Sequence, residues 1–131
     1  MFLEIIDLET GLMKYVNCGH PPALMVRKEN GEIEKLTRTG LALGMMNTIQ
    51  FTQGTSTLKA SDSLIVYSDG ITEAMNSKEE MYEEERLTRL LTTTLGLDTL
   101  HMMEALLKSV SEFIGQAEQS DDISLIVVKR C

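Results

Sequence analysis

Residues 63–70 read Ser-Leu-Ile-Val-Tyr-Ser-Asp-Gly, a nearly continuous apolar run that ends in a carboxylate and a glycine. Apolar runs of this length are typical of strands buried on both faces, because a half-buried strand would alternate with polar residues. The run therefore predicts a buried strand over 63–68. Asp69 follows it directly, so we expect its carboxylate to be held by a rigid element while its oxygens face solvent or a cleft.

A second acidic pair, Asp121-Asp122, directly precedes the β-branched run Ile123–Lys129. If the two runs are antiparallel neighbours, the end of one lies beside the start of the other, and Asp69 and Asp121 converge. Converging carboxylates repel each other unless they are protonated or bind a cation. An all-oxygen cluster suits Mg²⁺, Mn²⁺ or Ca²⁺. Taken singly, an Asp-Gly after a strand is commonly a turn and an acid pair in a loop is commonly solvated, so both interpretations stay open at this point.

Outward from these runs, the first half of the chain has the pattern of strands and the second half has that of helices. Turn residues separate the apolar segments, and Gly11 is expected to close the first hairpin. This pattern predicts strands over Phe2–Leu8, Leu12–Cys18, Ala23–Lys28, Glu32–Thr37, Ile49–Phe51 and Ser56–Leu58. Leucines at helical spacing predict a helix over Glu83–Leu95, and a second helix is expected to be capped by Asp98 and ended by Gly115. The layout is α+β: antiparallel sheets, two consecutive helices and a C-terminal strand in a single domain, residues 1–131.

Composition excludes several classes of function. The chain has 12 Lys+Arg against 20 Asp+Glu, a net charge of −8, which argues against nucleic-acid binding because that needs clustered cations. No apolar run approaches the roughly 20 residues that span a bilayer, so no membrane contact is expected. Acids near the N-terminus argue against a signal peptide, and Cys18 and Cys131 form no disulfide framework. These features favour a cytoplasmic protein.

Four short motifs occur in one order along the chain: Asn17-Cys18-Gly19-His20-Pro21-Pro22, Leu43-Gly44, Tyr67-Ser68-Asp69-Gly70-Ile71-Thr72-Glu73-Ala74 and Asp121-Asp122-Ile123-Ser124. In this order the chain resembles the metal-dependent PPM family of protein serine/threonine phosphatases, and more narrowly its bacterial branch typified by sporulation stage II protein E. The resemblance extends over about residues 2–129. It implies part of an α-β-β-α phosphatase sandwich.

The resemblance implies a hydrolase in which two Mn²⁺ or Mg²⁺ ions activate a water that attacks a phosphoserine or phosphothreonine. Asp69 and Asp121 match the family's metal aspartates, and Asp122 is a candidate for the layer of residues around the ligands. The implied substrate is a phosphorylated bacterial regulatory protein, and the family suggests one of the anti-sigma-factor-antagonist type.

Other polar residues near these motifs have structural explanations beside functional ones. We expect Gly70 to allow a tight backbone turn beside the ion. Glu73 could orient a metal-bound water or cap its segment. His20 is expected to be structural rather than a general acid, and Asn17 to be a hydrogen-bonding residue at a strand end. The acidic run 79–85 is expected to be a solvated loop and helix N-terminus.

The sequence departs from the family pattern in two ways. Glu83 stands where relatives usually have Gly after an aromatic residue. More importantly, the family's first metal motif, an Asp followed by Gly-His-Gly or Gly-Lys-Gly, has no match. The chain therefore resembles the C-terminal half of a phosphatase domain, expected by itself to be inactive or weak, with an incomplete metal site. The parent protein is expected to be the phosphatase. The alternative is a non-catalytic phosphatase-like interaction module, and in either case exposed apolar faces predict self-association.

Overall fold

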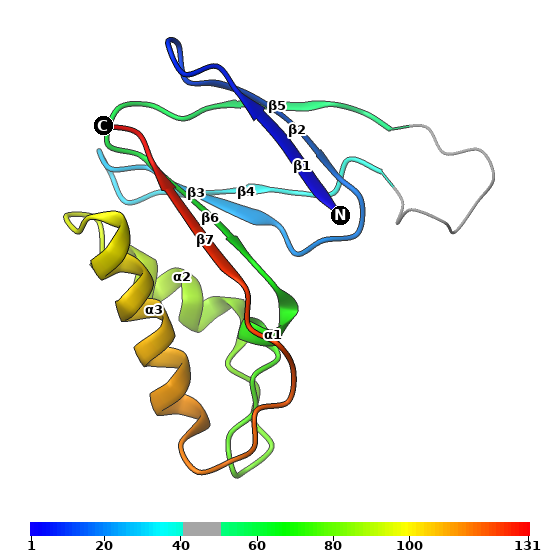
Figure 1. Ribbon diagram of the computed structural model, residues 1–131, viewed down its shortest axis with the longest axis vertical. Helices are drawn as coiled ribbons and strands as arrows, with labels where there is room; N and C mark the ends of the chain where they lie inside the picture. The colour runs from blue at the N-terminus through cyan, green and yellow to red at the C-terminus, as the bar shows by residue number, and fades with distance from the viewer. Residues whose placement is uncertain (41–50) are drawn as a thin grey trace.

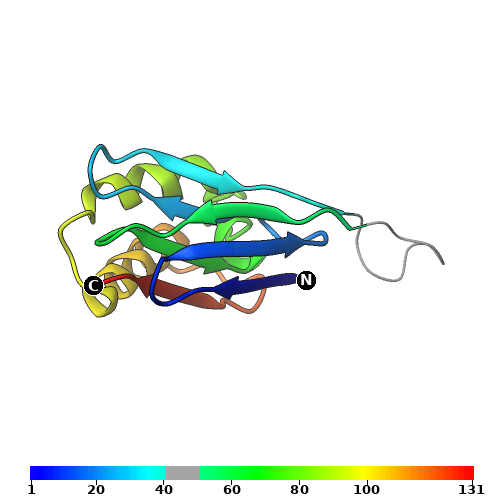
Figure 2. The same cartoon turned by 90° about the horizontal axis from the view of Figure 1, so that it is seen from above.

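Two β-sheets and a layer of helices make up the fold in a computed structural model that describes residues 1–40 and 51–131. Figure 1 shows the three-stranded sheet stacked on the four-stranded sheet, whose other face is covered by the two long helices. Figure 2 looks down on the stack, with the strands of the first sheet lying over the second. The observed architecture is the predicted α+β class of antiparallel sheets.

The first sheet has the strand order β1-β2-β5, with β1 at Phe2–Ile6, β2 at Leu12–Asn17 and β5 at Gly54–Thr57. The predicted hairpin is confirmed, and Gly11 closes it with φ of +76°. The predicted strand Ser56–Leu58 is confirmed in part, because β5 begins earlier, at Gly54, which pairs with Tyr15. A side chain at Gly54 would overlap the Tyr15 ring. Residues 49 and 50 of the predicted strand Ile49–Phe51, and Leu43-Gly44, lie outside the described residues.

The second sheet has the order β4-β3-β6-β7 and holds both runs that flank the aspartates. Its strands are β3 (Ala23–Val26), β4 (Ile33–Leu36), β6 (Ser63–Tyr67) and β7 (Leu125–Lys129). All three strand pairs are antiparallel, and Tyr67 at the end of β6 pairs with Leu125 at the start of β7. The predicted buried strand is thus confirmed in an interior position of the sheet.

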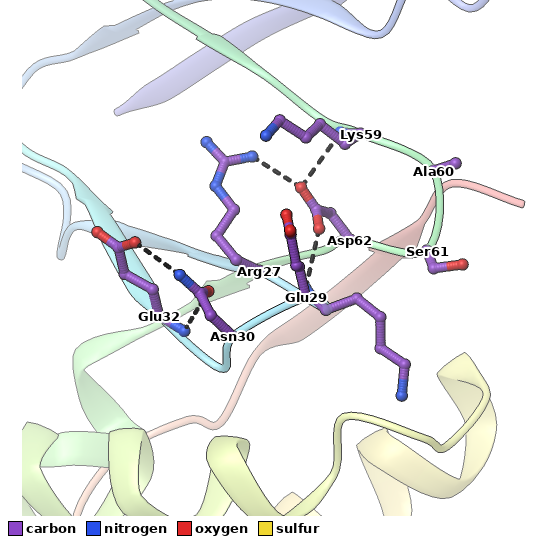
Figure 3. Close-up of a pocket in the computed structure, with 9 residues that line it drawn as sticks. Arg27, Glu29, Asn30, Glu32, Lys59, Ala60, Ser61 and Asp62 are labelled. Atoms are coloured by element: carbon purple, nitrogen blue, oxygen red, sulfur yellow. Dashed lines mark hydrogen bonds and ion pairs between the residues drawn. The ribbon is translucent and has the colours of Figure 1, made fainter.

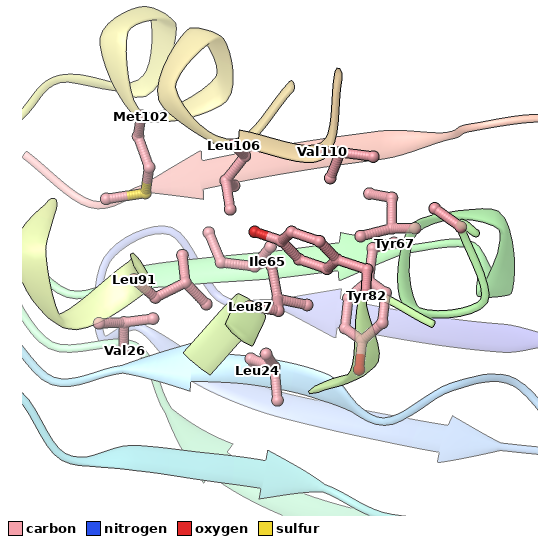
Figure 4. Packing of buried hydrophobic residues seen from close by; sticks show 12 residues of the cluster. Leu24, Val26, Ile65, Tyr67, Tyr82, Leu87, Leu91, Met102, Leu106 and Val110 are labelled. Atoms are coloured by element: carbon pink, nitrogen blue, oxygen red, sulfur yellow. The ribbon is translucent and has the colours of Figure 1, made fainter. Parts of the chain in front are cut away.

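Apolar side chains fill the two spaces between the layers. One cluster lies between the sheets and includes Met13, Met25 and Leu64. The other joins β3 and β6 to the helices, as Figure 4 shows for Ile65, Leu87 and their neighbours. Alternate residues of β3 and β6 enter opposite clusters, which explains why these strands are apolar along their length.

Three helices follow β6: α1 (Asp69–Thr72), α2 (Glu83–Thr93) and α3 (Thr99–Ile114). The two long helices were predicted. Asp98 caps α3 by accepting a hydrogen bond from the His101 N–H at 2.9 Å, and Gly115 ends it with φ of +60°. The short α1 was not predicted, because four residues are too few to show a periodic pattern.

Candidate functional site

Ser68 ties the segment after β6 to the segment before β7. Its backbone N–H donates to the Ser124 carbonyl at 3.0 Å, and its hydroxyl donates to the Asp122 carbonyl at 3.0 Å. The same hydroxyl accepts a hydrogen bond from the Ser124 N–H at 2.9 Å. One residue therefore makes three hydrogen bonds, two of them through its side chain, between the segments that carry the aspartates.

Gly70 reinforces this link through close backbone packing. It is buried, and a Cβ placed on it would overlap the Asp122 carbonyl oxygen and lie 3.0 Å from the Asp122 carbonyl carbon. Gly70 lies within α1 and has no left-handed backbone angle. The expected tight turn is therefore not its reason for being glycine. The missing side chain instead lets α1 approach the segment before β7.

The carboxylates of Asp69, Asp121 and Asp122 are all exposed at this end of the sheet. Asp69 begins α1, and its Oδ1 accepts a hydrogen bond from the Gly70 N–H at 3.1 Å. Asp121 Oδ1 accepts one from the Asp122 N–H at 2.7 Å, while Gln119 Nε2 donates to the Asp121 carbonyl at 2.7 Å. Among the described residues, no Lys, Arg or His forms an ion pair with these three carboxylates.

The donor chemistry at this end fits a hard divalent cation, because carboxylate oxygens are the ligands that Mg²⁺ and Mn²⁺ prefer. The set is incomplete, however. Within residues 1–40 and 51–131, no group of three or more His, Cys, Asp or Glu side chains is arranged to hold a metal ion. Asp69 and Asp121 can therefore supply only part of a coordination shell.

Glu73 lies at the C-terminal end of α1, where its backbone N–H donates to the Asp69 carbonyl at 2.8 Å. Its side chain is exposed. The backbone of Glu73 thus closes the short helix that Asp69 begins, and its carboxylate is accessible on the same segment.

Asn17 and His20 belong to a different hydrogen-bond network at the end of β2. The fully buried Asn17 donates from Nδ2 to the Leu36 carbonyl at 3.2 Å and accepts the His20 N–H at 3.0 Å. The His20 ring nitrogen Nδ1 lies 2.9 Å from the Pro21 carbonyl oxygen. These contacts hold the turn after β2, and none of them reaches the aspartates.

Two polar contacts were missed by sequence reasoning. Glu84 belongs to the acidic run predicted to be solvated, but it is only partly exposed, pairs with Lys35 and accepts a hydrogen bond from the Tyr67 hydroxyl at 3.3 Å. Burial, together with the charge of Glu84, raises the pKa of Tyr67. Within the sequence, nothing marks Glu84 apart from the acids around it.

The second missed contact is at the opposite end of β6, at Asp62, directly before the strand. It is nearly buried and accepts hydrogen bonds from Arg27 Nη1 at 2.8 Å, from the Lys28 N–H at 2.9 Å and from the Lys59 N–H at 3.2 Å. Figure 3 shows this cluster, which borders a cavity of about 330 Å³. Because both carboxylate oxygens of Asp62 already have donors, the cluster joins two turns and leaves little capacity for a ligand.

The family of the chain follows from comparison with known proteins. The family model described as Stage II sporulation protein E (SpoIIE) matches residues 1–131. The chain belongs to the SpoIIE family. The resemblance drawn from the four motifs is thereby confirmed at the level of the family.

Curated relatives and solved structures agree with this assignment. Protein IcfG of Synechocystis sp. is 32% identical over 130 residues, covering 99% of this chain and 20% of IcfG. Phosphoserine phosphatase RsbU of Bacillus subtilis is 23% identical over 99% of this chain and 38% of RsbU. The SiaA-PP2C domain of Pseudomonas aeruginosa shares the fold with a TM-score of 0.84 at 16% identity, over 98% of this chain and 50% of that one.

A structure of the PP2C phosphatase domain and a fragment of the regulatory domain of SpoIIE from Bacillus subtilis matches with a TM-score of 0.76 at 27% identity. The match covers 98% of this chain and 36% of that one. The SpoIIE-family chain thus spans well under half the length of these curated relatives and about half of the SiaA domain. No helix in the described part of it is long and apolar enough to cross a bilayer.

Proposed function

We propose that the polypeptide carrying this chain is a metal-dependent phosphatase that removes phosphate from serine or threonine of a bacterial regulatory protein. Residues 1–131 are the C-terminal part of its phosphatase domain. The observation that carries the proposal is the link between the segments after β6 and before β7, made by Ser68 and Gly70. It holds two aspartate-bearing segments at one end of the same sheet in a chain of the SpoIIE family.

In this proposal Asp69 and Asp121 are oxygen ligands of Mn²⁺ or Mg²⁺, and other parts of the polypeptide complete the coordination shell. When bound, such ions lower the pKa of water and neutralise charge on the phosphoryl oxygens. The exposed carboxylates of Asp122 and Glu73 would accept hydrogen bonds from water near the ligands. Ser68 and Gly70 keep the two segments in fixed relation, so that the ligands need little rearrangement.

Charge supports a requirement for cations. The chain carries a net charge of −8 and exposes three aspartates at this end of the sheet. A phosphorylated substrate would be repelled by these carboxylates, whereas divalent cations held between them reverse the local charge. The substrate we propose is a phosphoserine- or phosphothreonine-containing protein of the anti-sigma-factor-antagonist type, in keeping with the phosphoserine phosphatase RsbU among the relatives.

The test is hydrolysis of a phosphoserine peptide by the natural polypeptide that contains this chain, with and without Mn²⁺. We expect Asp69→Asn to lower the Mn²⁺-dependent rate by about 100-fold or more, because it removes several kcal/mol of electrostatic stabilisation. Asp98→Asn is the matched control: it makes the same change at the exposed cap of α3. Full activity of the Asp69→Asn variant would remove Asp69 from the proposed site.

A second candidate, a non-catalytic interaction or dimerisation module, is favoured by one specific feature. Large apolar side chains are exposed on β1 of the first sheet, with Leu3 56% and Ile5 69% accessible. Neighbouring exposed apolar groups of this kind are typical of interaction surfaces. Absence of hydrolysis by the wild-type polypeptide with either ion, combined with dimers in light scattering, would favour this candidate. A monodisperse monomer at high concentration would count against self-association.

A further inference from the structure

A groove between α2 and α3 differs in chemistry from the rest of this acidic chain. It has a volume of about 310 Å³ and lies on the helical layer, away from the first sheet. Two arginines of α2, Arg86 and Arg89, line it together with the apolar side chains of Leu90 and Phe113. Within the described part of the chain, no acidic residue lines this groove, although the whole chain has 20 acids against 12 Lys and Arg.

The floor of the groove is held by a buried aromatic contact and a hydrogen bond between side chains. Tyr82 is 2% exposed, and its ring meets the edge of Phe113 at 5.4 Å between centroids and 78° between planes. The Tyr82 hydroxyl lies 2.7 Å from Ser109 Oγ, which joins the residue before α2 to the middle of α3. A surface fixed in this way loses little conformational entropy when a ligand binds.

The guanidinium groups of the two arginines are accessible to an anionic partner. The Arg86 guanidinium carbon lies 4.9 Å above the centre of the Phe113 ring, a stacking contact that orients the planar group. Arg89 forms an ion pair with Glu85 at 2.8 Å, but both side chains are more than 70% exposed. Exposed ion pairs of this kind contribute little to stability. A ligand carboxylate can therefore replace Glu85 as the partner of Arg89.

We propose that this groove binds an acidic segment of a partner protein, in which a carboxylate side chain is followed by a large apolar one. The carboxylate bonds to the guanidinium groups of Arg86 and Arg89, which match its two oxygens. The apolar side chain covers Leu90 and Phe113. The contact area is small, so the affinity is modest, with a dissociation constant of about 0.1–1 mM for an isolated peptide. This binding does not depend on the proposed hydrolysis.

The experiment is an NMR titration of the chain with the peptide Ser-Glu-Glu-Leu-Asp-Glu-Leu-Ser, following the Arg side-chain and Phe113 ring signals. We expect these signals to shift on binding. A matched peptide with Gln and Asn in place of Glu and Asp should bind at least about tenfold more weakly, since it cannot form the charged hydrogen bonds. Arg86→Gln combined with Arg89→Gln should weaken binding of the acidic peptide by a similar factor.

Lys108→Gln is the control variant, because it removes one positive charge from an exposed position of α3 that does not line the groove. It should leave binding unchanged, and circular dichroism should show all variants folded. Three results would overturn the proposal: no shift at millimolar peptide, equal binding by the double arginine variant, or shifts mapping elsewhere on the chain. Concentration-dependent shifts of the groove signals without peptide would assign the groove to a second copy and likewise overturn it.

Discussion

Gly70 and Asp122, 52 positions apart in the sequence, lie so close together that no side chain fits on Gly70. The contact is between main-chain atoms: a Cβ on Gly70 would overlap the Asp122 carbonyl oxygen. It brings α1, which begins with Asp69, against the segment that contains Asp121. The position of one candidate ligand is thereby coupled to that of the other through backbone packing.

Gly70→Ala should destabilise the chain by about 1–3 kcal/mol, because a backbone group cannot yield as a flexible side chain would. Urea unfolding followed by circular dichroism measures the change. Gly96→Ala is the control, since its nearest neighbour is the end of the Lys28 side chain at 3.9 Å; it should change stability by less than about 0.5 kcal/mol. Equal effects of the two substitutions would contradict the close contact.

Ser68→Ala should remove both side-chain hydrogen bonds that join the two segments, at a cost of about 1–2 kcal/mol. If these bonds also position Asp69 and Asp121, the Mn²⁺ affinity of the natural polypeptide should fall by about 10–100-fold. Ser68→Thr keeps the hydroxyl and should restore both properties. A stable Ser68→Ala variant with unchanged Mn²⁺ affinity would rule out the positioning role.

The cap of α3 should make stability depend on pH. Asp98 accepts the His101 N–H and its carboxylate lies 2.8 Å from His101 Nδ1. The hydrogen bond from the His101 N–H lowers the pKa of Asp98 from its usual 3.8, and the hydrogen bond to Asp98 raises the pKa of His101 from its usual 6.5.

Because the pKa of His101 is raised in the folded state, its protonated form stabilises the fold. This contribution is complete below pH 6.5 and is lost as the pH rises through the pKa of His101 in the folded state. The lowered pKa of Asp98 acts in the opposite sense: its contribution is present above pH 3.8 and is lost as pH falls through the folded value. The melting temperature of the wild type should therefore exceed that of His101→Gln most between about pH 4 and 6.5, and the difference should shrink towards about pH 9. A difference independent of pH would contradict this account.

Glu83 has φ of +64° at the start of α2, in the left-handed region that disfavours side chains. A glycine would adopt this backbone angle without strain. Glu83→Gly should stabilise the chain by about 1 kcal/mol, the strain relieved minus the added freedom of the unfolded chain. Glu85→Gly, two residues further along α2, should instead destabilise it by about 1 kcal/mol. The midpoints of denaturant unfolding of the two variants, compared with that of the wild type, test both expected changes in stability.

The elements with strong local signals could be predicted from sequence. The apolar runs at residues 63–68 and Ile123–Lys129 indicated two strands, observed as Ser63–Tyr67 and Leu125–Lys129, and the aspartates beside them indicated one shared end. What could not be predicted depends on packing partners. The roles of Ser68 and Gly70 depend on contacts with the segment before β7, which lies far from them in the sequence. Glu84 differs from the neighbouring acids only because it contacts Tyr67 and Lys35.

The central claim is that Asp69 and Asp121 act at one site. A double-mutant cycle tests it most directly: kcat/KM of Mn²⁺-dependent phosphoserine-peptide hydrolysis by the natural polypeptide, for Asp69→Asn, Asp121→Asn and both together. Residues that act as a unit give losses that do not multiply. We predict that the double variant is about as impaired as the worse single variant, whereas losses that multiply, or full activity of either single variant, would contradict a shared site.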